Sequence, residues 1–439
     1  MRTFILVISI LYFSPLIAQH TISGSFSPAE DFTWLIAYHL QPGTQGYIAD
    51  TAITDGEFSM QIPPNAATGT YRLVYGVPQE EYYFDVLYNG KEDIKLEFDA
   101  EKGIVFENSD ENKLFNSYFI EINAAKQKFI DYYTQKRTDK SAYNKLAENL
   151  ETLQTSYEES TTGMLLHQFV KANRPYIPSN YEASETYWQH KKDEFFKHLD
   201  INNTELQASG FLSDKLTNYV FTPVSMVKTS KTATEKILME NVKTVHEKLQ
   251  GTKAEYRVHI FQSLWNIAEA NELDETADFI YGSYLKNLAQ KTQNEELISE
   301  IETKKRLQIG AKAPEITWDD NGVAKSLSDM KGADCYIVIF WSSTCPHCLN
   351  ELPALHKELK NYPSVKVLAV GLEDNAASWE KERAKLNRFE HAIALGKWDS
   401  EYANIYDIHR TPTYFILDKD KRFIAKPESD RDIIDFLKK

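Results

Sequence analysis

Residues 335–355 read CYIVIFWSSTCPHCLNELPAL, and this stretch decides how the C-terminal part of the chain folds. It begins with Cys335–Trp341, an uninterrupted apolar run that predicts a buried strand. It ends with Leu349–Leu355, which opens a helical pattern. The turn between strand and helix therefore carries two cysteines separated by two residues, in the segment Cys345–Cys348.

The two cysteines indicate dithiol redox chemistry, because this spacing at a strand-to-helix turn is typical of it. Cys345 would stand at the start of the helix, where free N–H groups and the positive end of the helix dipole favour a thiolate. The thiolate is the form that attacks a disulfide. His347 lies between the cysteines and would stabilise the thiolate further when protonated.

Two other interpretations of the cysteine pair are weaker. A zinc site normally needs a second Cys/His pair at ligand spacing, and the chain has only one more cysteine, Cys335. A purely structural disulfide between residues so close together would constrain the unfolded chain very little. We therefore expect a redox pair and no metal. Cys335 begins the predicted strand and is interpreted as a small buried side chain without a catalytic role.

Length and composition indicate a folded protein with several domains. The chain has 439 residues, enough for about three domains of ordinary size. Hydrophobic residues make up 42% and aromatic residues 13% of it, as expected of packed cores rather than disorder. The net charge of −15 argues against nucleic-acid binding and against docking on anionic membranes.

Residues 1–19 are predicted to be a secretory signal peptide. Arg2 precedes an apolar run over residues 4–13, and Pro15 and Ala18 follow near a plausible cleavage position. An uncleaved membrane anchor is the second interpretation, because the run is short for a bilayer span. Both interpretations imply that the rest of the chain leaves the cytoplasm.

Residues 20–108 are rich in strand patterns. The segment Ile94–Asp99 alternates apolar and polar residues, as a half-buried strand does. The dipeptides Asp55-Gly56 and Asn89-Gly90 are typical of tight hairpins. We expect an N-terminal antiparallel β-sandwich.

Two further regions complete the predicted fold. Residues 109–306 change to long amphipathic helices, for example over Ala233–Leu249, and predict a central all-α region. Residues 307–439 alternate strands and helices, as a mixed α/β sheet does. Within them, Val365–Gly371 and Thr413–Asp418 are buried-strand candidates.

Thr411-Pro412 stands directly before the last of these strands. A proline that enters a strand near an active site is a candidate cis peptide, although an ordinary trans proline is the alternative. Together with the cysteine pair, it makes residues 307–439 resemble the thioredoxin superfamily. In that family a cis-proline loop faces the cysteines and hydrogen-bonds the bound disulfide substrate, so the resemblance assigns this role to Thr411 and Pro412.

Finer motifs resemble the TlpA/ResA-like branch of this superfamily. These motifs are Gly310–Ile316, Leu327–Gly332, Phe340–Thr344 and Glu351–Pro353. The resemblance covers roughly the last 130 residues, about one domain. A β-rich domain, a helical region and then this module also resemble multidomain TlpA-like proteins that Gram-negative bacteria export. The resemblance thus implies a location in the periplasm or cell envelope.

The resemblance assigns the steps of thiol exchange to particular residues. Cys345 would attack the substrate disulfide and Cys348 would resolve the mixed disulfide. In ResA-like proteins a glutamate three residues after the second cysteine is thought to handle the resolving thiol's proton, and that residue is Glu351 here. Ile339 takes the place of the buried acidic residue of a standard thioredoxin. A solvated helix glutamate is the alternative for Glu351, and Glu373 is a weaker rival for the proton role.

Substrate contacts are implied for the residues around the pair and in the proline loop: Trp341, Pro346, His347, Thr411 and Pro412. The Pro-His dipeptide is associated with oxidising DsbA-like sites, whereas the surrounding motifs are those of reductases. We favour the reductase direction, with an oxidase or isomerase as the alternative.

A peroxidase is disfavoured by the residues before the first cysteine. Peroxiredoxin chemistry needs a threonine or serine three residues before the peroxidatic cysteine and a proline seven before it. Ser342 satisfies the first condition for Cys345, but Val338 fails the second.

The sequence therefore predicts an exported thiol:disulfide oxidoreductase without a metal, nucleotide or flavin cofactor. Its partners would be disulfide-containing or dithiol exported proteins and a membrane or periplasmic thiol electron donor. A cell-envelope binding protein with a secondary redox module is the competing hypothesis. Residues 20–306 could position the module, dimerise it or restrict which disulfides reach it, so the oligomeric state stays open.

Overall fold

The computed structural model describes residues 20–222, 230–320 and 322–438. The predicted signal peptide, residues 1–19, lies outside the described residues. The chain divides into two compact units, one ending at Thr292 and the other beginning at Gln293. The domain boundaries predicted at residues 108 and 306 stay predictions.

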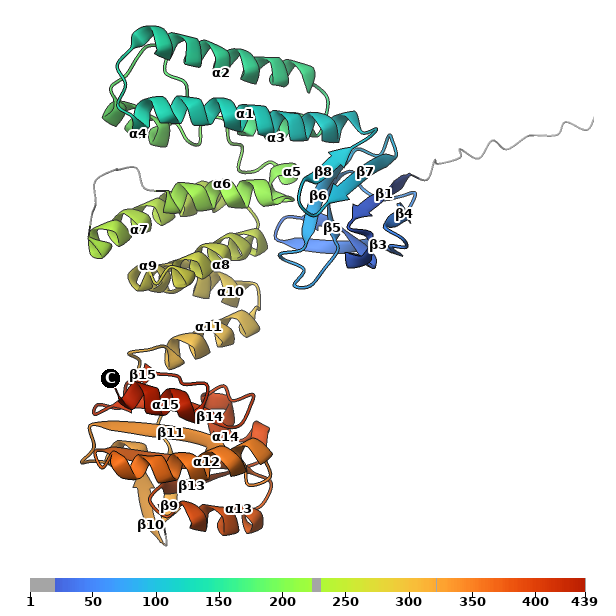
Figure 1. Cartoon of the computed structure of the whole chain (residues 1–439). Helices are drawn as coiled ribbons and strands as arrows, with labels where there is room; N and C mark the ends of the chain where they lie inside the picture. The colour runs from blue at the N-terminus through green and yellow to red at the C-terminus, as the bar shows by residue number, and fades with distance from the viewer. Residues whose placement is uncertain (1–19, 223–229, 321, 439) are drawn as a thin grey trace, which may run out of the picture. The chain divides into compact units, whose positions relative to one another are not determined.

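The first unit begins with a β-rich region that forms two four-stranded sheets, in the orders β4-β1-β7-β8 and β3-β2-β5-β6 (Figure 1). The strands are β1 (Thr21–Ser27), β2 (Trp34–Gln41), β3 (Thr44–Ala52), β4 (Glu57–Gln61), β5 (Gly69–Val74), β6 (Tyr83–Tyr88), β7 (Ile94–Asp99) and β8 (Gly103–Phe106). Apolar side chains from both sheets form one buried cluster that includes Ile22, Leu35, Tyr71 and Leu96.

The prediction of purely antiparallel pairing is wrong for one pair of strands. β1 and β7 run parallel, with Ile22 opposite Ile94. Parallel neighbours need a long crossover connection, and here the chain between them builds β2 to β6. The β-rich character of the region is confirmed, and its description as a sandwich stays a prediction.

The rest of the first unit is helical, as predicted. The helices are α1 (Asp110–Thr134), α2 (Lys140–Ser160), α3 (Leu166–Ala172), α4 (Ser184–Asp193), α5 (Thr204–Gln207), α6 (Gly210–Phe221), α7 (Lys231–Lys248), α8 (Ala254–Ala270), α9 (Asp274–Ile280) and α10 (Lys286–Lys291). Side-chain caps begin several of them; Ser109 and Asp139, for example, accept backbone N–H groups of the first turns of α1 and α2. No helix within the described residues is long and apolar enough to cross a membrane.

The second unit is a mixed five-stranded sheet with helices packed on it, in the order β13-β12-β11-β14-β15. Its elements are α11 (Glu295–Leu307), β9 (Thr317–Asp320), β10 (Val323–Ser326), β11 (Cys335–Trp341), α12 (Pro346–Glu358), β12 (Val365–Glu373), α13 (Ala376–Arg383), β13 (Glu390–Leu395), α14 (Glu401–Ile405), β14 (Thr413–Asp418), β15 (Phe423–Ala425) and α15 (Asp430–Leu437). β9 and β10 form a separate two-stranded ladder.

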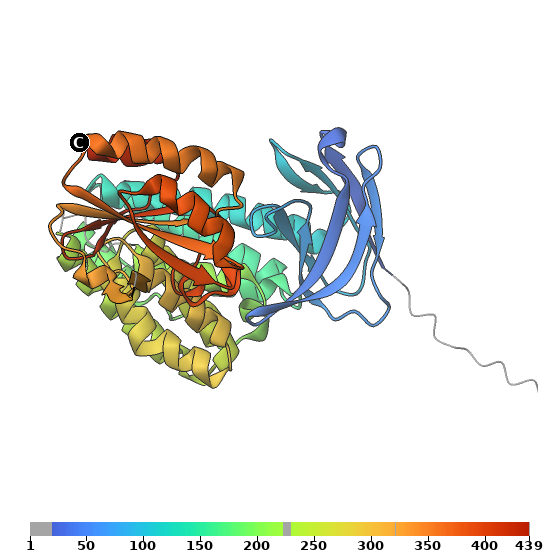
Figure 2. The same ribbon diagram turned by 90° about the horizontal axis from the view of Figure 1, so that it is seen from below.

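The central strand β11 is buried on both faces, which explains its continuous apolar run. Ile337, Ile339 and Trp341 face one core cluster, which also contains residues of α12 and α15. Those two helices lie side by side on that face (Figure 2). Tyr336 and Phe340 alternate into the cluster on the other face.

Candidate active site

Three segments meet at one edge of the second unit's sheet. β11 and β12 are parallel and end there, with Trp341 opposite Gly371. β14 is antiparallel to β11 and begins there, with Thr413 opposite Phe340. The loop that carries Cys345 and the Thr411–Pro412 segment are therefore neighbours, although they lie far apart in the sequence.

Cys345 is the N-cap residue of α12. Its Sγ accepts the backbone N–H of Cys348 at 3.4 Å, in the way that a serine or aspartate side chain caps a helix. Pro346 occupies the first turn, where its fixed φ suits the helix and its missing N–H costs nothing. The four residues Cys345 to Cys348 thus both cap and begin the helix, and the N–H groups of its first turn point at the Cys345 sulfur.

The two thiols of the pair have opposite acidities. Burial works against the Cys345 thiolate, but the backbone N–H of Cys348, the Thr411 side chain and the backbone N–H of His347 lower the pKa of the Cys345 thiol below its ordinary value. Burial raises the pKa of the Cys348 thiol to about 12. Cys345 is half-buried, whereas Cys348 is only 1% exposed. The pair therefore offers an accessible nucleophile and a protected, protonated second thiol.

The peptide bond between Thr411 and Pro412 is cis, as predicted. The Cys345 thiol donates to the carbonyl oxygen of Thr411 at 3.4 Å, so the proline loop faces the first cysteine. Thr411 and Pro412 are both half-buried and leave part of their surface open. The proline loop therefore has exposed surface beside Cys345.

Glu351 is held by a tyrosine that the sequence reasoning missed. The Tyr414 hydroxyl donates to Glu351 Oε2 at 2.9 Å. Tyr414 is opposite Ile339 in the sheet and shares a core cluster with Cys348. Burial, and then the Glu351 carboxylate, raise the pKa of Tyr414, so its hydroxyl remains a donor. Its strand position two residues after Pro412 is the only sequence signal that could have identified it.

Glu373 supports the loop before the cysteines. Its carboxylate is 1% exposed and accepts the backbone N–H of Ser343 at 2.5 Å and the Ser343 hydroxyl at 3.0 Å. Ser343 Oγ also lies 2.8 Å from the hydroxyl of Ser378 in α13. Glu373 therefore fixes the loop that ends at Cys345, and Ser343 is a further residue that the sequence reasoning missed.

The remaining predicted residues fall into two groups. Pro346 and His347 are exposed next to Cys345, where a substrate could touch them. Trp341 was predicted to contact substrate, but it is 1% exposed and packs in the core cluster with Cys348. This expectation is corrected because the alternation of β11 turns Trp341 inward, under α12. Cys335 is half-buried at the start of the strand and packs against the same cluster.

In the parts of the chain that the structure describes, no group of three or more His, Cys, Asp or Glu side chains could hold a metal ion. Cys345 and Cys348 are both free thiols.

Part of the chain is similar in sequence to known proteins. The model of the AhpC/TSA family matches residues 309–425. A thiol-disulfide oxidoreductase ResA of Bacillus cereus is 27% identical over 125 residues, 28% of this chain and 71% of that protein. The thioredoxin-like protein YneN of Bacillus subtilis is 29% identical over 116 residues, 26% of this chain and 67% of that protein.

Among solved structures, a domain of a possible thiol-disulfide isomerase from Cytophaga hutchinsonii is 32% identical to this chain. The match covers 30% of this chain and 91% of that domain, with a TM-score of 0.27.

Proposed function

The C-terminal domain of this chain is an AhpC/TSA-family, thioredoxin-like domain of a TlpA/ResA-like thiol–disulfide oxidoreductase, and from this premise we propose that Cys345 and Cys348 reduce disulfides in exported proteins. The observation that carries the proposal is the difference between the two thiols. Cys345 has a lowered pKa and is accessible, whereas Cys348 is buried and its pKa is raised to about 12.

In the first step, the Cys345 thiolate attacks one sulfur of the client disulfide. The client S–S bond breaks, a mixed disulfide forms on Cys345, and the released client thiolate takes a proton from water. The Thr411 carbonyl, next to the Cys345 sulfur, and the adjoining Pro412 would align the client backbone for this attack. The protonated state of Cys348 keeps it from competing for the substrate at this stage.

In the second step, Cys348 loses its proton and attacks the Cys345 sulfur. The mixed disulfide breaks, the client leaves as a dithiol with two electrons, and a disulfide joins Cys345 and Cys348. Glu351 lies one helical turn after Cys348 and would accept this proton, with Tyr414 holding its carboxylate in place. A membrane or periplasmic thiol donor would then return two electrons to the pair.

The reducing direction is supported by the way His347 acts on the pair. Its backbone N–H helps to lower the pKa of Cys345, while its side chain is exposed to solvent. A dithiol becomes a strong oxidant when its reduced form is strongly stabilised, and an exposed imidazole contributes little to that. The reduction potential of the pair tests the direction, and a value of about −120 mV, the strongly oxidising end, would reverse it.

A trapping experiment tests the exchange itself. In a Cys348→Ala variant expressed in cells, the second step is blocked and mixed disulfides should accumulate on Cys345. The double variant Cys345→Ala/Cys348→Ala is the control and should trap nothing. Absence of any trapped protein in the single variant would contradict the proposal. Cell fractionation of the same strain tests the proposed export to the periplasm or cell envelope.

A cell-envelope binding protein is the second candidate function, and a large cavity in the first unit favours it. The double cysteine variant separates the two candidates. A cellular phenotype that survives loss of both thiols would favour the binding function, whereas loss of the phenotype favours thiol exchange.

A further inference from the structure

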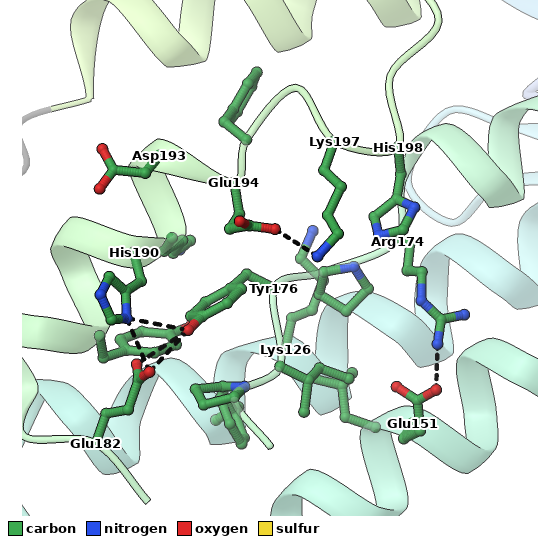
Figure 3. Close-up of a pocket in the computed structure, with 18 of the residues that line it drawn as sticks. Lys126, Glu151, Arg174, Tyr176, Glu182, His190, Asp193, Glu194, Lys197 and His198 are labelled. Atoms are coloured by element: carbon green, nitrogen blue, oxygen red, sulfur yellow. Dashed lines mark hydrogen bonds and ion pairs between the residues drawn. The ribbon is translucent and has the colours of Figure 1, made fainter. Parts of the chain in front are cut away.

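A cavity of about 790 Å³ lies in the helical region of the first unit (Figure 3). Helices α1, α2, α4 and α6 contribute to its wall, together with residues 172–182. Its volume is in the range of about 300–1,000 Å³ that small-molecule sites occupy. We call it the lysine cavity, after Lys126, Lys191 and Lys215 in its lining.

These three lysines come from three different helices, α1, α4 and α6, and all are half-buried. Among the described residues, none of them forms an ion pair with a carboxylate. Lys215 Nζ donates to the side-chain oxygen of Asn173 at 2.6 Å, and Lys191 Nζ lies 4.7 Å from the centre of the Trp188 ring. Both partners are neutral and leave the positive charges uncompensated.

The carboxylates of the cavity are already occupied by other groups. Glu151 pairs with Arg174, and Glu194 pairs with Lys197. Glu182 accepts the Tyr176 hydroxyl and contacts His190, as Figure 3 shows. The exposed Asp193 accepts the side-chain amide of Gln189.

The lysines also lie close enough to repel one another. Burial, and then the charge of Lys126, lower the pKa of Lys191 to about 8. Burial, and then the charges of Lys126 and Lys191, lower the pKa of Lys215 to about 7. Lysines seldom leave water without a partner of opposite charge, so the charged form of three of them around one cavity is unfavourable unless an anion enters it.

Another part of the cavity lining is aromatic. Tyr187 stacks on Tyr133 with ring centres 3.7 Å apart and an interplanar angle of 1°. Tyr176 stacks on Tyr187 at 5.9 Å and 29°. Tyr187 and Phe129 are buried, 2% and 1% exposed, so the half-buried Tyr176 is the lining ring against which a flat apolar group could pack.

We propose that the lysine cavity binds a small organic dianion, a phosphate monoester or a dicarboxylate, that carries an aromatic or similarly flat portion. The dianionic end would lie among Lys126, Lys191 and Lys215, and the flat end would lie against Tyr176. This site is independent of the dithiol, because all of its residues belong to the first unit.

Isothermal titration calorimetry of the purified chain tests the site with phenyl phosphate, phthalate, inorganic phosphate and phenol. Phenyl phosphate or phthalate should bind at least about tenfold more tightly than inorganic phosphate or phenol, because only they have both the charge and the ring. Tighter binding of phenyl phosphate than phthalate would identify phosphate esters as the ligand class, and the reverse would identify dicarboxylates. Failure of both aromatic dianions to bind at millimolar concentration would overturn the proposal.

Substitution of the lysines locates the binding. Lys126→Met and Lys215→Met should each weaken binding by about tenfold or more, since each removes a charge-assisted hydrogen bond. Lys128→Met is the matched control, because Lys128 is exposed on the same helix as Lys126 and outside the lining. Unchanged affinity in both cavity variants, or an equal loss in the control, would contradict the assignment.

Thermal unfolding separates this role from a purely structural one. Without ligand and below pH 7, Lys215→Met should unfold at the same or a higher temperature than the natural chain, because the variant lacks a half-buried charge that has no carboxylate partner. Phenyl phosphate should stabilise the natural chain and not the variant. A variant that unfolds at a lower temperature without ligand would show that Lys215 serves the fold, against the proposal.

Discussion

The dithiol and the lysine cavity both remove ionisable groups partly from water. They differ in what offsets the cost of removing a charge from water. At the dithiol, the protein supplies the compensation itself: first-turn N–H groups and the side chain of Thr411 lower the pKa of Cys345 despite its burial. In the cavity, burial and mutual repulsion lower the pKa values of Lys191 and Lys215 without an opposing carboxylate among the described residues. We propose thiol exchange for the first arrangement and the binding of an anionic ligand for the second.

The largest expected effect follows from removing the first thiol. Cys345→Ser should reduce the rate of disulfide reduction by a factor on the order of a thousand or more, because a hydroxyl does not supply the nucleophile. Release of thiols from a model peptide disulfide measures this rate. Cys335→Ser is the control and should stay within about twofold of the natural chain. If both variants lost the same fraction of the reduction rate, the activity would not depend on the Cys345–Cys348 pair.

The contrast between the two cysteines should appear in their alkylation by iodoacetamide. The pKa of Cys345 is below the ordinary 9.0 and that of Cys348 is about 12, so the thiolate fractions at pH 8 differ on the order of a thousandfold. Labelling of Cys345 should rise with pH to a plateau with a midpoint below 9.0, measured by mass spectrometry in a Cys335→Ala background. Equal labelling rates for both thiols would contradict the proposed division of roles.

The same pKa shifts determine the sign of the pH dependence of stability. Cys345, with its lowered pKa, stabilises the folded state above pH 9.0, and this contribution is lost as the pH falls through its folded pKa. Cys348, with its raised pKa, destabilises the folded state as the pH rises from 9.0 towards about 12. Denaturation of Cys345→Ala and Cys348→Ala as a function of pH distinguishes the two contributions.

A smaller effect is expected at the proposed proton acceptor. Glu351→Gln should slow decay of the mixed disulfide by about 10- to 100-fold, since water replaces the carboxylate, and leave the first attack within about twofold. Quenched-flow measurement of the mixed disulfide separates the two steps. Glu358→Gln, an exposed glutamate on the same helix, is the control. If both steps slow equally, Glu351 serves the structure of the site.

The smallest expected effect is on stability, at Glu373. Glu373→Gln weakens two buried hydrogen bonds to Ser343 and should cost about 1–3 kcal/mol of unfolding free energy in the second unit. Labelling of Cys348 during chemical denaturation reports on that unit, because this thiol is buried when the unit is folded. Asp374→Asn is the control, since its ion pair with Lys397 is at the surface and contributes less.

Local patterns in the sequence were enough to predict the strand, turn and helix that form the centre of the candidate site. The apolar run of β11, the CPHC segment and the start of α12 are consecutive, so their conformations follow from neighbouring residues. The cis bond at Pro412 was also predictable, because only X-Pro bonds adopt cis at modest cost. The inward position of Trp341 could also have been predicted from strand alternation. The family resemblance instead suggested that Trp341 contacts the substrate.

The tertiary structure decided which distant residues surround that centre. Tyr414 reaches Glu351 across 63 positions and Glu373 reaches Ser343 across 30, because neighbouring strands of the sheet bring them together. The parallel pairing of β1 with β7 likewise joins residues that are far apart in the sequence.

The sequence by itself determined the dithiol, since its spacing and its helix start are encoded within a few residues. Only the tertiary structure brought Lys126, Lys191 and Lys215 from three helices to one cavity. Each of them looks like an ordinary solvated lysine in the sequence. The electrostatic cost of their proximity exists only after the helices have packed, because it depends on distance and burial that no local pattern records.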